Sequence, residues 1–107
     1  MKIFVIGSYS VKSKKEINDN IQKAIRAGIK ILKKGHLPFV PQSMFAFWEE
    51  SIEMENIMKA CFEWIKECDA VLVLNTGKKE GGIYSSIEVA RKNNKIIFNS
   101  LDELPQG

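Results

Sequence analysis

Apolar residues along this chain of 107 residues change their spacing from one segment to the next, and the pattern predicts strands that alternate with helices. Residues 3–6 form a continuous apolar run that stops at Gly7, which is typical of a strand buried on both faces. Residues 17–32 then place apolar side chains at helical spacing, and Lys33-Lys34-Gly35 ends this helix with cations and a glycine. The S-x-x-E spacing of residues 13–16 is a capping box, which predicts where the helix begins.

The rest of the chain continues this alternation. Residues 36–41 predict a second, shorter strand, and its two prolines place it at a sheet edge because proline donates no ladder hydrogen bond. A loop over residues 42–50 precedes a second helix that runs from about Ser51 to Cys68. The remaining pattern predicts a strand over 70–74, a polar turn over 75–82, a third helix across 83–90, a strand over 95–98 and a turn of helix over 101–104.

Strands that alternate with helices predict one α/β domain over residues 1–107, with a parallel sheet of four strands and room for a fifth. The proline-bearing strand at the edge gives the strand order 2-1-3-4. In such sheets, ligands bind beyond the carboxyl ends of the strands, at the point where the strand order reverses. This rule places the candidate site in residues 7–10, 41–48 and 75–86.

Composition and charge narrow the classes of function. The chain is 45% hydrophobic and 27% charged, as in an ordinary globular protein, and its net charge of +3 is spread along the sequence. A nucleic-acid-binding protein usually shows a denser basic face, so we do not expect a nucleic-acid partner. No apolar run approaches the length of a membrane span, and the apolar run at the start is too short for a signal peptide. Two cysteines without a secretory signal predict a cytoplasmic location.

Two glycine-containing loops are candidates for ligand binding. Residues 7–10 follow a buried strand, and Gly81-Gly82 precede the third helix, where backbone amides and the helix dipole favour an anion or a sugar hydroxyl. Neither loop has the G-x-G-x-x-G or P-loop pattern, so an ordinary turn is the alternative for each. The ligand-binding residues expected here are Gly7, Ser8, Tyr9, Asn75, Gly81, Gly82 and Ser86.

The aromatic and cysteine residues have simpler alternatives. Phe45, Phe47 and Trp48 crowd one loop, where they form a pocket lid, stack on a nucleobase, line a subunit interface or pack against the neighbouring helix. Cys61 and Cys68 lie too far apart along one helix for a disulfide. With one histidine in the chain and no C-x-x-C motif, we expect both thiols in the core, and neither a metal nor a cofactor.

These features together resemble the nucleoside 2-deoxyribosyltransferase superfamily, which includes the deoxynucleoside 5'-monophosphate N-glycosidases, and most of all its small, mostly uncharacterised members. The resemblance covers nearly the whole chain and rests on the order and spacing of four stretches, namely residues 3–8, 35–41, 63–73 and 81–90. It implies a three-layer, flavodoxin- or Rossmann-like fold, a nucleoside site at the strand tips, and dimers or larger assemblies.

The resemblance also implies a glutamate on the third helix that attacks the anomeric carbon of the sugar. Counting from Gly82 and back from Ala90 puts Ser86 at this position. Glu88 is two residues further on, which turns its side chain about 200° away around the helix. The supporting aspartate of the superfamily falls on Cys61, and Glu80 stands where phosphate-preferring members carry a serine. Ser86 and Glu88 are therefore only weak catalytic candidates.

We expect from this pattern a nucleoside- or nucleotide-binding protein that forms homo-oligomers and whose glycosidic chemistry is weakened or lost. The alternative is an active N-glycosidase or deoxyribosyltransferase that cleaves or exchanges the base of a (deoxy)nucleoside or its monophosphate. A third interpretation is an unrelated flavodoxin-like module that binds protein partners.

Overall fold

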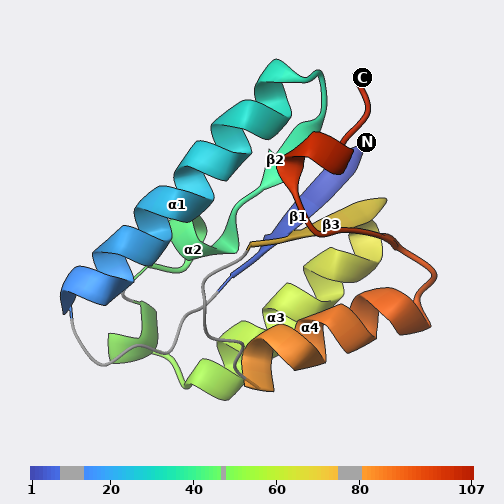
Figure 1. The fold of residues 1–107 in the computed structure, drawn as a ribbon. Coiled ribbons are helices and arrows are strands. Elements are labelled where there is room, and N and C mark those ends of the chain that lie inside the picture. The colour runs from blue at the N-terminus through green and yellow to red at the C-terminus, as the bar shows by residue number, and fades with distance from the viewer. Residues whose placement is uncertain (8–13, 47, 75–80) are drawn as a thin grey trace.

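The structure is a computed structural model that describes residues 1–7, 14–46, 48–74 and 81–107. Strands and helices alternate along the chain, as Figure 1 shows. The elements are β1 (Lys2–Ile6), α1 (Lys14–Lys33), β2 (Leu37–Phe39), α2 (Pro41–Met44), the 3-10 turn η1 (Trp48–Glu50), α3 (Met54–Glu67), β3 (Ala70–Val73), α4 (Gly81–Lys92), β4 (Ile96–Phe98) and the 3-10 turn η2 (Leu101–Glu103).

The four strands form one parallel sheet in the order β2-β1-β3-β4. The pairing register places Phe4 of β1 between Phe39 of β2 and Val71 of β3. This arrangement confirms the predicted α/β class and strand order, including the proline-bearing strand at an edge.

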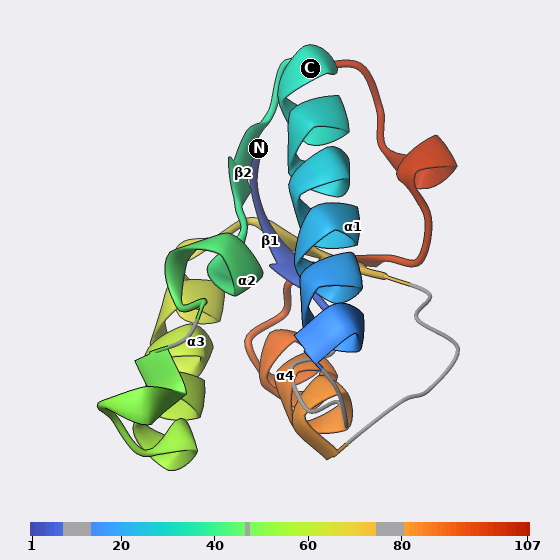
Figure 2. The ribbon, with the colours of Figure 1, turned by 90° about the vertical axis from the view of Figure 1, so that its left-hand side faces the viewer.

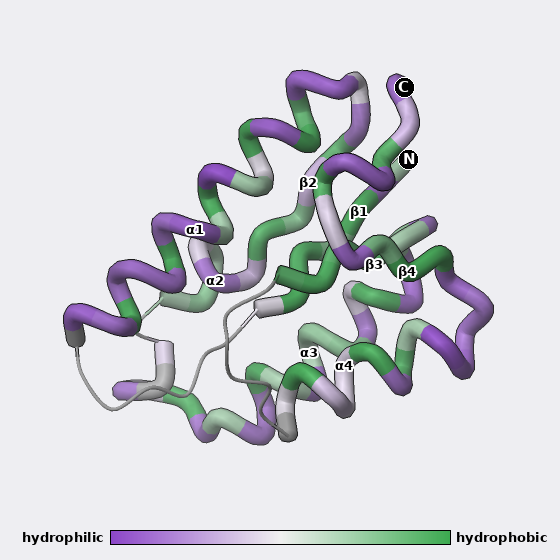
Figure 3. The backbone as a smooth tube through the Cα atoms, viewed as in Figure 1, coloured by the Kyte–Doolittle hydropathy of each residue, from purple (hydrophilic) through white to green (hydrophobic). Residues whose placement is uncertain are grey.

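Alternate residues of β1 point to opposite faces of the sheet, and both faces are covered. Phe4 and Ile6 pack with α3 and α4 on one face, whereas Ile3 and Val5 pack with α1 on the other. Figures 1 and 2 show α1 on one side of the sheet and the α3–α4 pair on the other. The apolar residues therefore concentrate in the strands and on the inward faces of the helices, as the colours of Figure 3 show.

The segment after β2 differs from the expected strand and loop. The strand ends at Phe39 rather than at residue 41, and Pro41 begins a short helix where residues 42–44 had been expected in a loop. Proline has no N–H to donate, and its fixed φ suits the first turn of a helix, so it ends the strand and starts α2. Trp48–Glu50 form a 3-10 turn instead of irregular loop.

The other boundaries of helices and turns lie closer to those predicted from the sequence. Gly35 has a φ of +90° just after α1, as expected of a glycine that ends a helix. The second predicted helix starts at Met54 rather than near Ser51, and the predicted turn near residue 101 is η2. The capping residue Ser13 lies outside the described residues. Within the described part of the chain, no helix is long and apolar enough to cross a membrane.

The two chain ends lie close together at the amino ends of the strands (Figure 1), and both contact His36, the single histidine of the chain. His36 is 3% exposed, with Nδ1 2.9 Å from the amino group of Met1 and Nε2 2.6 Å from the carbonyl oxygen of Pro105. Nearby, the Lys34 ammonium donates to the carbonyl oxygens of Leu101 and Leu104. His36 is therefore occupied by structural contacts at this end of the sheet.

Helix α1 approaches the segment after β2 closely, and Gly28 makes this possible. A Cβ atom at Gly28 would lie 2.6 Å from Cγ2 of Val40, which is closer than real Cβ atoms come. Val40 directly precedes Pro41, the first residue of α2. The Gly28–Val40 contact thus fixes where α2 begins relative to α1.

We predict that Gly28→Ala lowers the free energy of unfolding by about 1–3 kcal/mol, because the added methyl group overpacks this contact. In a Val40→Ala background, where the contacted methyl groups are gone, the same change should cost less or stabilise the helix. Urea denaturation of the wild-type protein, the two single variants and the double variant measures the energetic coupling between positions 28 and 40. A stabilising effect of Gly28→Ala in the wild-type background would contradict the contact.

Candidate functional site

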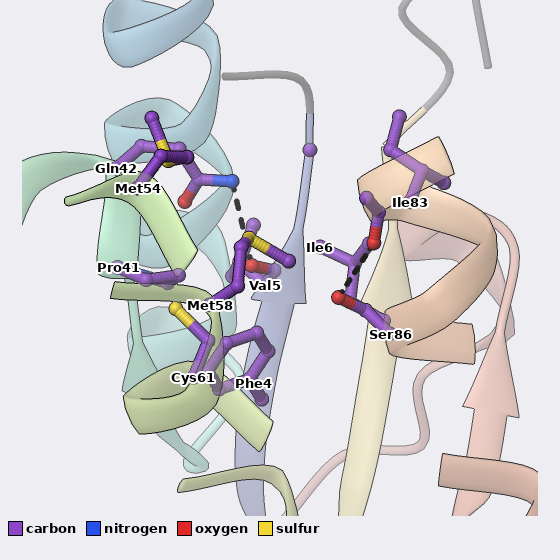
Figure 4. Close-up of a pocket in the computed structure, with 12 residues that line it drawn as sticks. Phe4, Val5, Ile6, Pro41, Gln42, Met54, Met58, Cys61, Ile83 and Ser86 are labelled. Atoms are coloured by element: carbon purple, nitrogen blue, oxygen red, sulfur yellow. Dashed lines mark hydrogen bonds between the residues drawn. The ribbon is translucent and has the colours of Figure 1, made fainter. Parts of the chain in front are cut away.

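A cavity of about 180 Å³ lies at the carboxyl end of β1, between α2 and α3 on one side and α4 on the other (Figure 4). It occupies the end of the sheet at which the sequence places the candidate site. The described residues that line it are all uncharged; they are Phe4, Val5, Ile6, Gly7, Pro41, Gln42, Met54, Met58, Cys61, Gly82, Ile83 and Ser86.

Gly7 ends β1 at the point where the cavity begins. A Cβ atom at this position would lie 2.8 Å from Nε2 of Gln42 and 3.2 Å from Cδ1 of Leu74. A larger residue here would have to displace the end of the Gln42 side chain, so Gly7 leaves room for the Gln42 carboxamide beside β1.

Gln42 is a polar lining residue that we did not single out from the sequence. Its side chain is 2% exposed, and its Nε2 donates a long hydrogen bond of 3.5 Å to the carbonyl oxygen of Val5. Strand β2 ends level with Phe4, so the Val5 carbonyl, one residue further along β1, lies beyond the paired part of β2. The Gln42 amide takes up this acceptor, while its own Oε1 is buried and has no hydrogen-bond partner among the described residues. The sequence does offer one signal that could have identified Gln42: it is a polar residue directly after the proline that follows the strand.

Ser86 and Cys61 line the same cavity from α4 and α3 (Figure 4). Ser86 is 5% exposed, and its hydroxyl donates to the carbonyl oxygen of Gly82 at 2.9 Å. Cys61 is 2% exposed. The two residues that the resemblance aligns with a catalytic glutamate and its supporting aspartate thus meet at one cavity, although they are far apart in sequence.

Glu88, the other weak catalytic candidate, lies on the exposed side of α4. Its side chain is 48% exposed, and its Oε2 is 2.7 Å from Nη1 of Arg91. It does not line the cavity. The turn of about 200° between positions 86 and 88 explains why one faces the cavity and the other faces solvent.

The remaining candidates differ in where they lie relative to the cavity. Gly7 and Gly82 line the cavity, whereas Phe45 and Trp48 do not. Phe45 is buried in the core, with its ring edge-on to that of Trp48 at a centroid distance of 4.8 Å. Gly81 begins α4. The candidates that lie outside the described residues are Ser8, Tyr9, Phe47, Asn75 and Glu80.

The two cysteines are buried and are not joined by a disulfide. Burial raises the pKa of the Cys68 thiol above its ordinary value, and the neighbouring Asp69 carboxylate raises it further. Cys68 therefore stays protonated at neutral pH, which makes it a poor nucleophile and metal ligand. Among the described residues, no cluster of three or more His, Cys, Asp or Glu side chains could hold a metal ion.

Residues 1–99 match the family model described as "Domain of unknown function (DUF7768)", and the chain belongs to this family. No protein with a curated function matches the chain. Among solved structures, it is similar to the 2-deoxyribosyltransferase of the psychrotolerant bacterium Bacillus psychrosaccharolyticus, described as a biocatalyst for the synthesis of antiviral and antitumoral nucleosides. The TM-score is 0.66 at 14% identity, over 91% of this chain and 69% of that chain. At this identity, the likeness shows a shared fold.

Proposed function

We propose that this member of the DUF7768 family binds a nucleoside or nucleotide in the cavity at the end of β1, with glycosidic chemistry that is weakened or lost. The observation that carries this proposal is that the described residues lining the cavity are uncharged: Ser86 and Cys61 stand where the resembled enzymes carry carboxylates. The cavity lies at the carboxyl ends of the strands, where parallel α/β sheets bind ligands. The fold shared with a 2-deoxyribosyltransferase supports the class of ligand.

The lining suits binding better than displacement at a sugar carbon. Apolar side chains from three elements form the walls, and a few polar atoms remain to orient a ligand, as in many small-molecule sites. Displacement at an anomeric carbon needs a carboxylate that attacks it or stabilises an oxocarbenium-like centre. The Ser86 hydroxyl donates to a backbone carbonyl, and the His36 imidazole is engaged by the chain ends, so neither takes the place of a carboxylate.

We predict that at least one nucleoside or nucleoside 5'-phosphate raises the Tm of the wild-type protein by about 4 °C or more at tenfold its Kd. Gly82→Leu should abolish this shift, because Gly82 lines the cavity and the larger side chain fills it next to Met58. Ser85→Leu is the matched control, since Ser85 is exposed on the same helix. The absence of any Tm shift across the panel at millimolar ligand would overturn the proposal.

A second prediction concerns the release of the base from deoxynucleosides, which chromatography measures. The wild-type protein should release little base from deoxynucleosides, whereas Ser86→Glu should raise release by about tenfold or more. Position 86 lines the cavity, so the new carboxylate would face a bound sugar, although burying it there lowers stability. Adding Cys61→Asp restores the second charge, but the double variant should be less stable, because this carboxylate is buried on the apolar side of α3.

Glu88→Gln is the control, because Glu88 is exposed and paired with Arg91 and should not affect base release. Rapid base release by the wild-type protein would contradict weakened chemistry and favour the alternative of an active N-glycosidase or deoxyribosyltransferase. Loss of that release in Glu88→Ala would identify Glu88 as the nucleophile.

We also propose that the chain forms homo-oligomers. Trp48 and Tyr84 are 41% and 58% exposed, and large apolar side chains at the surface favour association. Light scattering at micromolar concentration should return a mass of at least twice 12.2 kDa. Trp48→Ala should shift the mass towards that of one chain. A wild-type mass of 12.2 kDa would contradict self-association.

A further inference from the structure

The edge of the sheet at β2 carries an exposed apolar surface. Four large apolar side chains are about half exposed there, namely Ile29 (49%), Leu32 (59%), Leu37 (61%) and Trp64 (42%). They come from three elements that meet at this edge, α1, β2 and α3. We refer to these four residues as the β2-edge surface.

Contacts across β2 place these side chains on its two sides. Phe39 of β2 stacks on Trp64 of α3 at a ring-centroid distance of 4.4 Å, so α3 reaches the edge strand on this face of the sheet. On the other face, a Cβ atom at Gly28 of α1 would lie 3.8 Å from Cβ of Pro38. Leu32 is one helical turn after Gly28 and therefore lies on the β2 side of α1. Exposed apolar side chains thus border the open edge of β2 on both faces of the sheet.

The backbone of β2 does not suit pairing with a further strand. Leu37 donates its N–H to the carbonyl oxygen of Met1, so the N–H of Leu37, and by alternation that of Phe39, faces β1. Residue 38 then faces the open edge, and as a proline it has no N–H to donate. A partner at this edge is therefore held by side chains rather than by strand addition.

The size of the β2-edge surface matches one half of a protein–protein interface. At about 200 Å² for each fully exposed large side chain, its exposed fractions amount to about 400 Å² of apolar surface. One partner in a standard interface buries about 800 Å², of which about 450–500 Å² is apolar. Figure 2 shows α2 and η1 on the same side of the molecule as β2, and their Met44 and Trp48 side chains are 45% and 41% exposed. Together these side chains supply the apolar area that a dimer needs.

The charges beside the β2-edge surface differ between α1 and α3. On α1, the exposed residues Arg26 and Lys33 border the exposed apolar residues within one helical turn. On α3, the exposed residues Glu63 and Glu67 lie one turn apart beside the exposed tryptophan, and Lys66 pairs with Glu63 on the side away from it. We call the first pair the basic flank and the two glutamates the acidic flank.

We propose that the β2-edge surface binds a second copy of this chain, with α1 of each copy against α3 of the other. The proposal rests on the homo-oligomer of the proposed function and names its interface. A two-fold axis perpendicular to the sheet would place α1 against α1 and α3 against α3, so like charges would meet. A two-fold axis parallel to the strands turns one sheet over, and the basic flank then meets the acidic flank at both contacts. Charge therefore selects the second arrangement.

Light scattering of two matched variants tests the apolar part of the interface. Leu37→Lys should raise the dissociation constant of the dimer about tenfold or more, because it places a hydrated ammonium group in an apolar contact. Ile96→Lys is the control and should leave the dissociation constant unchanged. Leu37 and Ile96 are the first residues of the two edge strands, and they are 61% and 50% exposed. Both variants should therefore fold as the wild-type protein does, which circular dichroism checks.

Charge reversal tests the orientation of the two copies. One variant reverses the acidic flank with Glu63→Lys and Glu67→Lys. Another reverses the basic flank with Arg26→Glu and Lys33→Glu. Each alone should raise the dissociation constant about tenfold or more, because like charges then meet at both contacts. An equimolar mixture of the two variants should associate as tightly as the wild-type protein. Glu88→Lys, on the exposed side of α4, is the control and should have no effect.

The outcomes separate this inference from the proposed function. A dimer that persists unchanged in Leu37→Lys would overturn the β2-edge interface and leave the homo-oligomer standing. Self-association that neither flank reversal weakens would overturn the orientation. A wild-type mass of 12.2 kDa would assign the surface to a different partner and overturn both this inference and the homo-oligomer. Nucleoside binding, which the Tm shift measures separately, would stand in each case.

Discussion

The burial of β1 on both faces is the constraint on which the rest of the structure depends. Its side chains alternate between two apolar layers, so helices must cover both sides of the sheet. The strand is central in the order β2-β1-β3-β4 and continues past its shorter edge neighbour. Its last residues therefore leave the sheet with part of their backbone unpaired by β2. The cavity forms at this end, where α2 rather than a strand lies next to β1.

Much of this fold was predictable from the spacing of apolar residues. The runs that became β1 and β3 are short, continuous and apolar, and the stripes of α1 and α3 repeat at helical spacing. Pro38 correctly placed β2 at an edge, because the loss of a ladder donor is a local property. Pro41 was predicted in the strand rather than at a helix start, since proline is compatible with both a strand edge and the first turn of a helix.

The candidate site was predictable in position more than in composition. The carboxyl ends of parallel strands indicated the region, and Gly7, Gly82 and Ser86 do line the cavity. Gln42 was not identified, because its burial depends on a carbonyl group in β1 that β2 leaves unpaired. That Ser86 and Cys61 lie at one cavity depends on the packing of α3 and α4, which no local pattern encodes. The ligand-binding roles of all the candidate residues, Ser8, Tyr9 and Asn75 included, stay predictions.

The close contact of Gly28 with Val40 has a consequence for the energetics of any ligand at Gln42. Because α1 holds Val40 in place, the chain enters α2 from a fixed point, and the Gln42 side chain is packed against Gly7 before a ligand arrives. Little conformational entropy then remains to be lost at this residue on binding. The glycine in the middle of α1, on the opposite side of the sheet from α3 and α4, thereby preorganises one wall of the cavity.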